Sequence, residues 1–128
     1  MLSYSKSMIA LWLLLMAGVT GAAQQAPEHQ APPDNVQGSW TIYSKNVEDG
    51  ETVKKFVHLN QDGHHVSGNF RGPNQSGRIH GFVNGHHIEF STETHNVLTF
   101  RGRVDGDQMS GLYGIHGRHA EWRAVRQN

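Results

Sequence analysis

The chain has 128 residues, with 11 basic and 11 acidic residues, ten histidines and no cysteine. The balanced charge argues against nucleic acid as a partner, and the lack of cysteine excludes both disulfide bonds and a lipid attached through cysteine. A small domain of this kind must be held together by its own core, and the histidines are the feature that suggests metal binding or a response to pH.

The first 23 residues have the layout of a secretory signal peptide. Lys6 precedes an apolar run from Met8 to about Val19, and small residues follow at 21–23. The run is short for a membrane span, so we expect cleavage of residues 1–23, with an uncleaved anchor as the alternative. The mature protein is then exported, periplasmic or secreted, and does not span a membrane.

The next segment, residues 24–37, reads QQAPEHQAPPDNVQ and contains almost no apolar residues. This Pro- and Gln-rich composition predicts a disordered spacer. A single domain is then expected over residues 38–128.

Three Asp-Gly or Asn-Gly pairs, in NQDGHHVSGNF, FVNGHHIEF and VDGDQMSGLY, stand between runs of alternating apolar residues. Such pairs favour two-residue hairpin turns, because both turn positions need positive φ. No helical period appears outside the signal segment, so the domain is predicted to be all-β. The expected strands cover residues 39–45, 53–60, 64–71, 77–83, 86–92, 96–104, 107–115 and 119–126.

The connections favour an eight-stranded antiparallel up-and-down β-barrel, a meander, over a two-sheet sandwich. The three tight turns alternate along the chain with the connections NVEDGE, GPNQS, ETHN and HGRH, which we expect to be longer. Successive connections of a meander lie at opposite ends. The sequence therefore predicts one end closed by tight turns and one open end with four longer loops.

Alternation along the strands assigns the apolar side chains to the barrel interior. Four glycines share the inward register: Gly68, Gly81, Gly102 and Gly111. They let the strands coil and leave room for internal rings, or they leave room for a ligand, and we favour the first interpretation. The predicted interior is Trp40, Ile42, Val57, Leu59, Val66, Phe70, Ile79, Val83, Ile88, Phe90, Leu98, Phe100, Val104, Met109, Tyr113, Ile115 and Trp122.

The two ends of the domain, QGSW and EWRAVR, resemble the calycin group, which includes the lipocalins and avidin-like proteins. Gly38, Ser39 and Trp40 match the Gly-x-Trp of the first strand in that group. Arg126 matches, by position, the basic residue that packs across that Trp. The resemblance implies a barrel with one plugged end and one open end.

Departures limit what this resemblance carries over. The chain is shorter than a typical lipocalin and has no helix after the barrel, and TIYSKN after Trp40 lacks the Asn and Ser pattern with which avidins hold biotin. Biotin binding is therefore not implied, and no ligand-contacting residue of either family is transferred.

The open end is the first candidate site, for a small apolar or amphiphilic ligand. Inward residues near the longer loops form an apolar wall with a few polar groups, which is typical of a small-ligand pocket. A cavity lined by the aromatic members would favour binding, and mutual contact of their rings would favour a solid barrel. The candidate ligand-binding residues are Ser44, Phe70, Phe90, Asn96, Leu98, Tyr113 and Trp122.

A second candidate, a metal site, lies at the closed end. His64, His86 and Asp107 each follow the glycine of a tight turn and share the inward register. Two imidazoles and a carboxylate suit Zn, Cu or Ni. The alternative is that Asp107 pairs with Arg126 and the histidines are solvated.

Enzyme motifs are missing from the sequence, and inward carboxylates are nearly absent, so we expect no catalytic activity. No organic cofactor is expected either. The main hypothesis is an exported binding barrel. The alternatives are a protein-interaction module with a solid barrel, such as an inhibitor or an envelope accessory factor, and a His-rich metal-binding protein.

Three apolar residues, Tyr43, Leu112 and Val125, face outward on the first and last two strands, which adjoin in a closed barrel. A contiguous apolar patch there would support a weak, two-fold homodimer. The alternative is that the three differ in height along their strands and form no patch.

Overall fold

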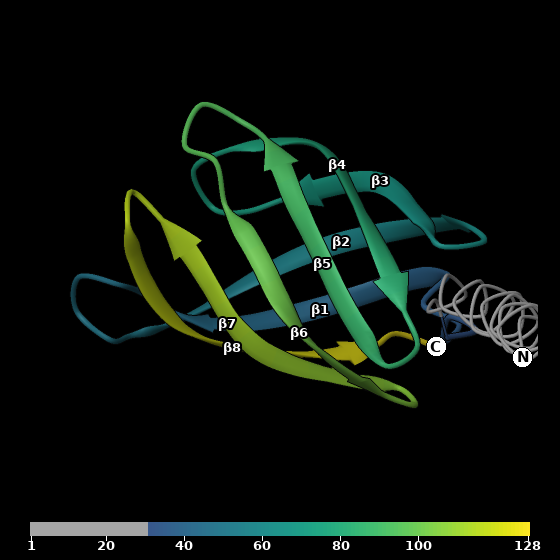
Figure 1. Ribbon diagram of the computed structural model, residues 1–128. Coiled ribbons are helices and arrows are strands. Elements are labelled where there is room, and N and C mark those ends of the chain that lie inside the picture. Colours follow the sequence, from purple (N-terminus) through teal and green to yellow (C-terminus); the bar gives the residue numbers. More distant parts are fainter. Residues whose placement is uncertain (1–30) are drawn as a thin grey trace, which may run out of the picture. The chain divides into compact units, whose positions relative to one another are not determined.

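A computed structural model describes residues 31–128, which fold as one closed barrel of eight antiparallel strands (Figure 1). Neighbours in sequence pair throughout, and β1 closes the barrel by pairing with β8. The predicted all-β meander is confirmed, and the predicted signal peptide lies outside the described residues. The strands are β1 (Gly38–Lys45), β2 (Thr52–Asp62), β3 (His65–Arg71), β4 (Ser76–Asn84), β5 (His87–Glu93), β6 (Thr99–Asp105), β7 (Gln108–Ile115) and β8 (Arg118–Arg126).

The three expected tight turns gather at one end of the barrel, which we call the closed end. The two turn positions are Gly63–His64, Gly85–His86 and Gly106–Asp107, and in each pair the glycine alone has positive φ, of 62°, 58° and 61°. The expectation of positive φ at both positions is therefore wrong for these turns: glycine stands first, as in a type II′ turn, and the preceding Asp or Asn ends the strand. The connections β1–β2, β3–β4, β5–β6 and β7–β8 lie at the opposite, open end (Figure 1).

The prediction of a longer loop is wrong for HGRH. Only His116 and Gly117 separate β7 from β8, with φ of 50° and 76°. A histidine tolerates the left-handed region at moderate cost, and this pair differs from the turns of the closed end because both of its positions have positive φ, as in a type I′ turn. The open end therefore has three loops and one tight turn.

The predicted interior residues are all buried except Ile115, which is partly buried. On the closed-end side of the open-end loops, the barrel interior is filled by a cluster of aromatic rings centred on Phe100. Its ring centroid lies 4.9 Å from that of Phe90, 5.4 Å from that of Tyr113 and 5.4 Å from that of Trp122. These rings leave no room for a ligand in the middle of the barrel.

Two of the inward glycines face each other across adjacent strands, since Gly102 pairs with Gly111. A Cβ on Gly111 would lie 1.9 Å from the Arg101 carbonyl oxygen, and one on Gly102 would lie 2.9 Å from the Trp122 ring. The missing side chains therefore let β6 and β7 coil tightly around the Trp122 ring. This agrees with the structural interpretation of the glycines.

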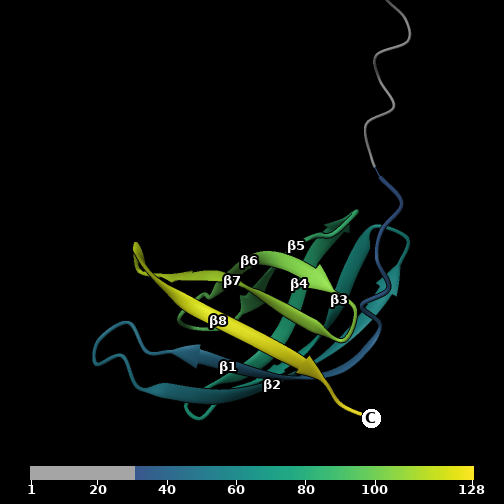
Figure 2. The ribbon, with the colours of Figure 1, turned by 90° about the horizontal axis from the view of Figure 1, so that it is seen from below.

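Residues 31–37, the closed-end segment, lie against the barrel before β1 (Figure 2). Val36 is completely buried, its carbonyl accepts a 3.0 Å hydrogen bond from the Trp40 indole, and its amide donates to Gln61. The amide of Asp34 donates to the Gly85 carbonyl at 2.9 Å. Packing of the domain thus begins before Gly38, inside the range predicted as a spacer.

Arg126 completes the closed end. Its guanidinium lies over the Trp40 ring, 4.4 Å from the ring centre, and donates to the carbonyls of Asn35 and Gln37 at 2.8 and 2.6 Å. Its Nε also pairs with Asp107 at 2.8 Å. One side chain therefore joins β8, the closed-end segment and the β6–β7 turn.

Over residues 31–128, no helix is long and apolar enough to cross a bilayer.

Candidate functional site

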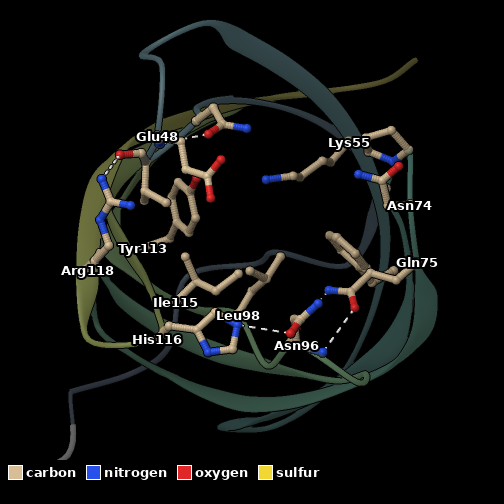
Figure 3. A pocket seen from close by; sticks show the side chains of 15 residues that line it. Glu48, Lys55, Asn74, Gln75, Asn96, Leu98, Tyr113, Ile115, His116 and Arg118 are labelled. Atoms are coloured by element: carbon tan, nitrogen blue, oxygen red, sulfur yellow. Dashed lines mark hydrogen bonds between the residues drawn. The ribbon is translucent and has the colours of Figure 1, made fainter.

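The open end contains a cavity of about 450 Å³ (Figure 3). All four connections of that end contribute to its mouth, through residues such as Glu48, Asn74, Asn96 and His116. Its volume lies within the range usual for small-ligand pockets. The cavity lies above the ring cluster, so the interior is hollow at the mouth and filled below.

Four of the predicted ligand-binding residues line this cavity: Phe70, Asn96, Leu98 and Tyr113. Ile115 adds a further apolar side chain from the end of β7. Leu98 and Ile115 project together from one side in Figure 3. The wall they form is apolar, as the sequence pattern predicts.

The other three predicted ligand-binding residues do not line the cavity. Phe90 and Trp122 lie beneath it, with ring centroids 6.1 Å apart in an edge-to-face arrangement. Ser44 is completely buried in the wall. Alternation gives the direction of a side chain but not what covers it: the Phe90 and Trp122 rings pack on Phe100, and the Ser44 hydroxyl accepts a hydrogen bond from Lys55.

Lys55 lines the same cavity and is missing from the predicted interior. Its side chain is only 8% exposed, although it carries an ammonium group. Nζ donates a 2.7 Å hydrogen bond to the Ser44 hydroxyl and lies 4.7 Å from the centre of the Tyr113 ring. The sequence contained a signal for this inward position, since Lys55 stands two residues before the inward Val57 and four before the inward Leu59 on the same strand.

Burial has opposite effects on the two titratable groups at this position. It lowers the pKa of Lys55 from the ordinary 10.5 to about 8, because the charged form loses hydration. It raises the pKa of Tyr113, an effect that the nearby Ser44 hydroxyl partly offsets. The Tyr113 hydroxyl donates to the Lys45 carbonyl at 2.6 Å, which fixes the ring beside Lys55.

Side-chain hydrogen bonds join the connections around the mouth. Gln75 donates to the Asn96 carbonyl at 2.7 Å and accepts from the Asn96 amide at 3.1 Å, and His116 Nε2 lies 2.9 Å from Asn96 Oδ1. Arg118 donates to the Val47 carbonyl on the other side. These bonds hold the mouth in one shape before any ligand arrives, which lowers the entropic cost of binding.

No protein-family model matches the sequence, and no curated protein matches it either.

The three predicted metal ligands have separate partners at the closed end. His64 Nδ1 lies 2.9 Å from the Val83 carbonyl, His86 Nδ1 lies 2.7 Å from Asp34, and Asp107 pairs with Arg126. Over the described residues 31–128, no three His, Asp or Glu side chains are grouped to hold a metal ion. The structure thus does not bring these side chains together.

The predicted outward patch is also interrupted. Leu112 is 53% and Val125 is 38% exposed, but Leu112 is level with Glu121, and Val125 is level with Gln108. The two are four positions apart along β7, about 13 Å. Arg123 lies between them with its guanidinium 4.3 Å from the centre of the Tyr43 ring.

Proposed function

We propose that this protein is an exported binding barrel that holds a small amphiphilic ligand in the cavity at its open end. The observation that supports this most is a hollow of ligand size above a solid ring cluster, with an apolar wall and a buried polar group, Lys55. The hydrogen bonds around the mouth add a preformed entrance. Binding rather than catalysis is the expected role.

The proposal includes a calycin-like origin of the barrel. The support is the stacking of Arg126 on Trp40 at the closed end, the contact that the Gly-x-Trp resemblance implies. The filled closed end and the hollow open end fit the same plan. The signal-like sequence of residues 1–23 supports the export that the proposal includes.

The competing hypothesis is an interaction module that works through its outer surface. The ring cluster beneath the cavity favours the interaction module, since a barrel core that is filled by its own side chains needs no ligand. The two hypotheses differ in one respect: only the binding barrel needs the cavity to be open.

The test is saturable binding of Nile red, a neutral dye that fluoresces in apolar surroundings. Ile115→Trp would place an indole into the cavity from its wall, and Leu112→Trp is the matched control because Leu112 faces outward on the same strand. We expect Ile115→Trp to weaken binding by about tenfold or more, because the indole takes the space of the dye. No saturable binding to the wild type, or equal binding to both variants, would exclude the proposed function.

A further inference from the structure

The cavity contains a cation, Lys55, that has no anionic partner among residues 31–128. Over residues 31–128, the ion pairs involve His80, His86, Arg101 and Arg126 and not Lys55. In the part of the chain that the structure describes, the polar and aromatic partners of the Lys55 ammonium are the neutral Ser44 hydroxyl and the face of the Tyr113 ring. Resting on the function proposed above, we infer that the ligand is an amphiphile with a single negative charge, such as a carboxylate on an apolar chain, whose charged group pairs with Lys55.

The energetics of Lys55 support this inference. A buried charge is costly unless a counter-charge and hydrogen bonds replace its lost hydration. Ser44 and Tyr113 replace part of the hydration but none of the counter-charge. The lowered pKa of Lys55 is a second sign of that cost. An anionic group in the cavity would supply the missing counter-charge and gain a charge-assisted hydrogen bond.

The placement of the side chains gives the ligand a direction. Lys55 extends into the cavity from one side, and Leu98 and Ile115 lie on another (Figure 3). A carboxylate at Nζ would therefore leave its apolar chain free to lie along Leu98, Ile115 and the Phe70 ring that also lines the cavity. A neutral apolar ligand would use the same wall and leave Lys55 unpaired.

Other charged or titratable groups also face the cavity. Glu48 comes from the β1–β2 loop, His116 from the β7–β8 turn and Arg118 from the start of β8. Glu48 is exposed and forms no ion pair with Lys55. Arg118 is engaged with the Val47 carbonyl at the rim. Among the cations lining the cavity, Lys55 is the buried one, so it is the group that gains most from an anion.

The experiment compares three ligands with one chain and different head groups: dodecanoate, dodecanol and dodecyltrimethylammonium. Each is titrated against Nile red bound to the mature protein, the two ionic amphiphiles below their micelle concentrations and dodecanol below its solubility limit. We expect the wild type to bind dodecanoate about tenfold or more tighter than dodecanol, because a hydrogen bond between charged groups contributes that much binding free energy. The cationic amphiphile should bind most weakly.

The variants assign that preference to one residue. In Lys55→Met the ratio of dodecanoate to dodecanol affinity should fall to about one, while dodecanol still binds. Lys54→Met is the matched control, because Lys54 is the exposed neighbour on β2, with Nζ 5.8 Å from the centre of the outward Tyr43 ring. Dodecanol binding by Lys55→Met also shows that the variant folds with its cavity intact.

The second readout is the pH dependence of binding by the wild type, which can be measured even if Lys55→Met does not fold. The carboxylate preference of the wild type should decline between pH 7.5 and pH 9.5 as Lys55 loses its proton, and the decline should be absent from Lys55→Met where that variant folds. An equal affinity of the wild type for dodecanoate and dodecanol would overturn the inference and leave the binding function intact. A preference that survives in Lys55→Met would do the same. Failure of every amphiphile and of Nile red would instead exclude the binding function itself.

Discussion

The guanidinium of Arg126 covers the indole of Trp40 at 4.4 Å, and the same guanidinium holds the backbone of the closed-end segment. A cation over an aromatic face is attractive, more so where water is excluded. Trp40 in turn holds Val36 through its indole N–H. The closed end therefore behaves as one unit, in which the last strand, the first strand and the segment before it stabilise one another.

Replacing the Trp40 ring should lower the stability of the protein more than most other single substitutions in the chain. Trp40→Ala removes the largest fully buried side chain, and we expect a loss of about 3–5 kcal/mol in the free energy of unfolding. Urea denaturation of the variant and the wild type measures it. A denaturation midpoint unchanged within error would contradict the role of Trp40 as a plug.

Replacing the guanidinium should loosen the closed-end segment more than the barrel. Arg126→Met removes the bonds to Asn35, Gln37 and Asp107, at a cost of about 2 kcal/mol. Hydrogen exchange at the Asp34 amide, which is bonded to Gly85, should become faster. Arg123→Met is the control, since Arg123 faces outward over Tyr43; equal exchange rates in the two variants would refute the anchoring role.

The low pKa of Lys55 predicts how stability depends on pH. The unfolded chain keeps this proton up to about pH 10.5, whereas the folded protein releases it near 8, so the unfolded state binds more protons between these values and stability rises with pH. From pH 7 to pH 9 the gain is about 1 kcal/mol relative to Lys55→Met. Tyr113, with its raised pKa, acts in the opposite direction above that window.

Urea denaturation of the wild type and Lys55→Met at both pH values gives the difference, and Lys54→Met provides the control for loss of a positive charge on β2. A constant difference between wild type and Lys55→Met across this range would show that Lys55 keeps its ordinary pKa.

The facing glycines of β6 and β7 give a steric prediction. Gly111→Ala would place its Cβ 1.9 Å from the Arg101 carbonyl oxygen and 2.6 Å from the Gly102 Cα, and neither backbone atom can move freely. We expect a loss of about 3 kcal/mol or more. Gly117→Ala meets no atom within 4 Å and bears only the cost of its φ of 76°, about 1 kcal/mol. Comparable denaturation midpoints for the two variants would show that the strands can separate locally.

The strands and the interior could be predicted because their signals are local. Asx-Gly pairs fix the positions of the turns, and a period of two separates the apolar face from the polar one. The start of β6 is later than predicted, at Thr99, because Leu98 donates from its amide to the Thr92 hydroxyl and stays in the loop. Such a bond leaves no trace in the alternation.

The parts that sequence reasoning missed depend on contacts across the barrel. Lysine is assigned to the surface by default, and burial of Lys55 becomes reasonable only once Ser44 and Tyr113 are known to meet it. The closed-end segment has too few apolar residues to predict order. Its position depends on partners far along the chain, Gln61 and Arg126, which no local pattern connects to it.

Both ends of the described chain lie at the closed end of the barrel: Ala31 is bonded to Asn84 beside the β4–β5 turn, and Arg126 lies over Trp40. The four connections that line the mouth of the cavity lie at the far end (Figure 1). A tether joined directly to either end of residues 31–128 would therefore leave the entrance unobstructed and directed away from the point of attachment. Fusion to another domain, or immobilisation on a sensor surface, should preserve ligand uptake whichever terminus is used.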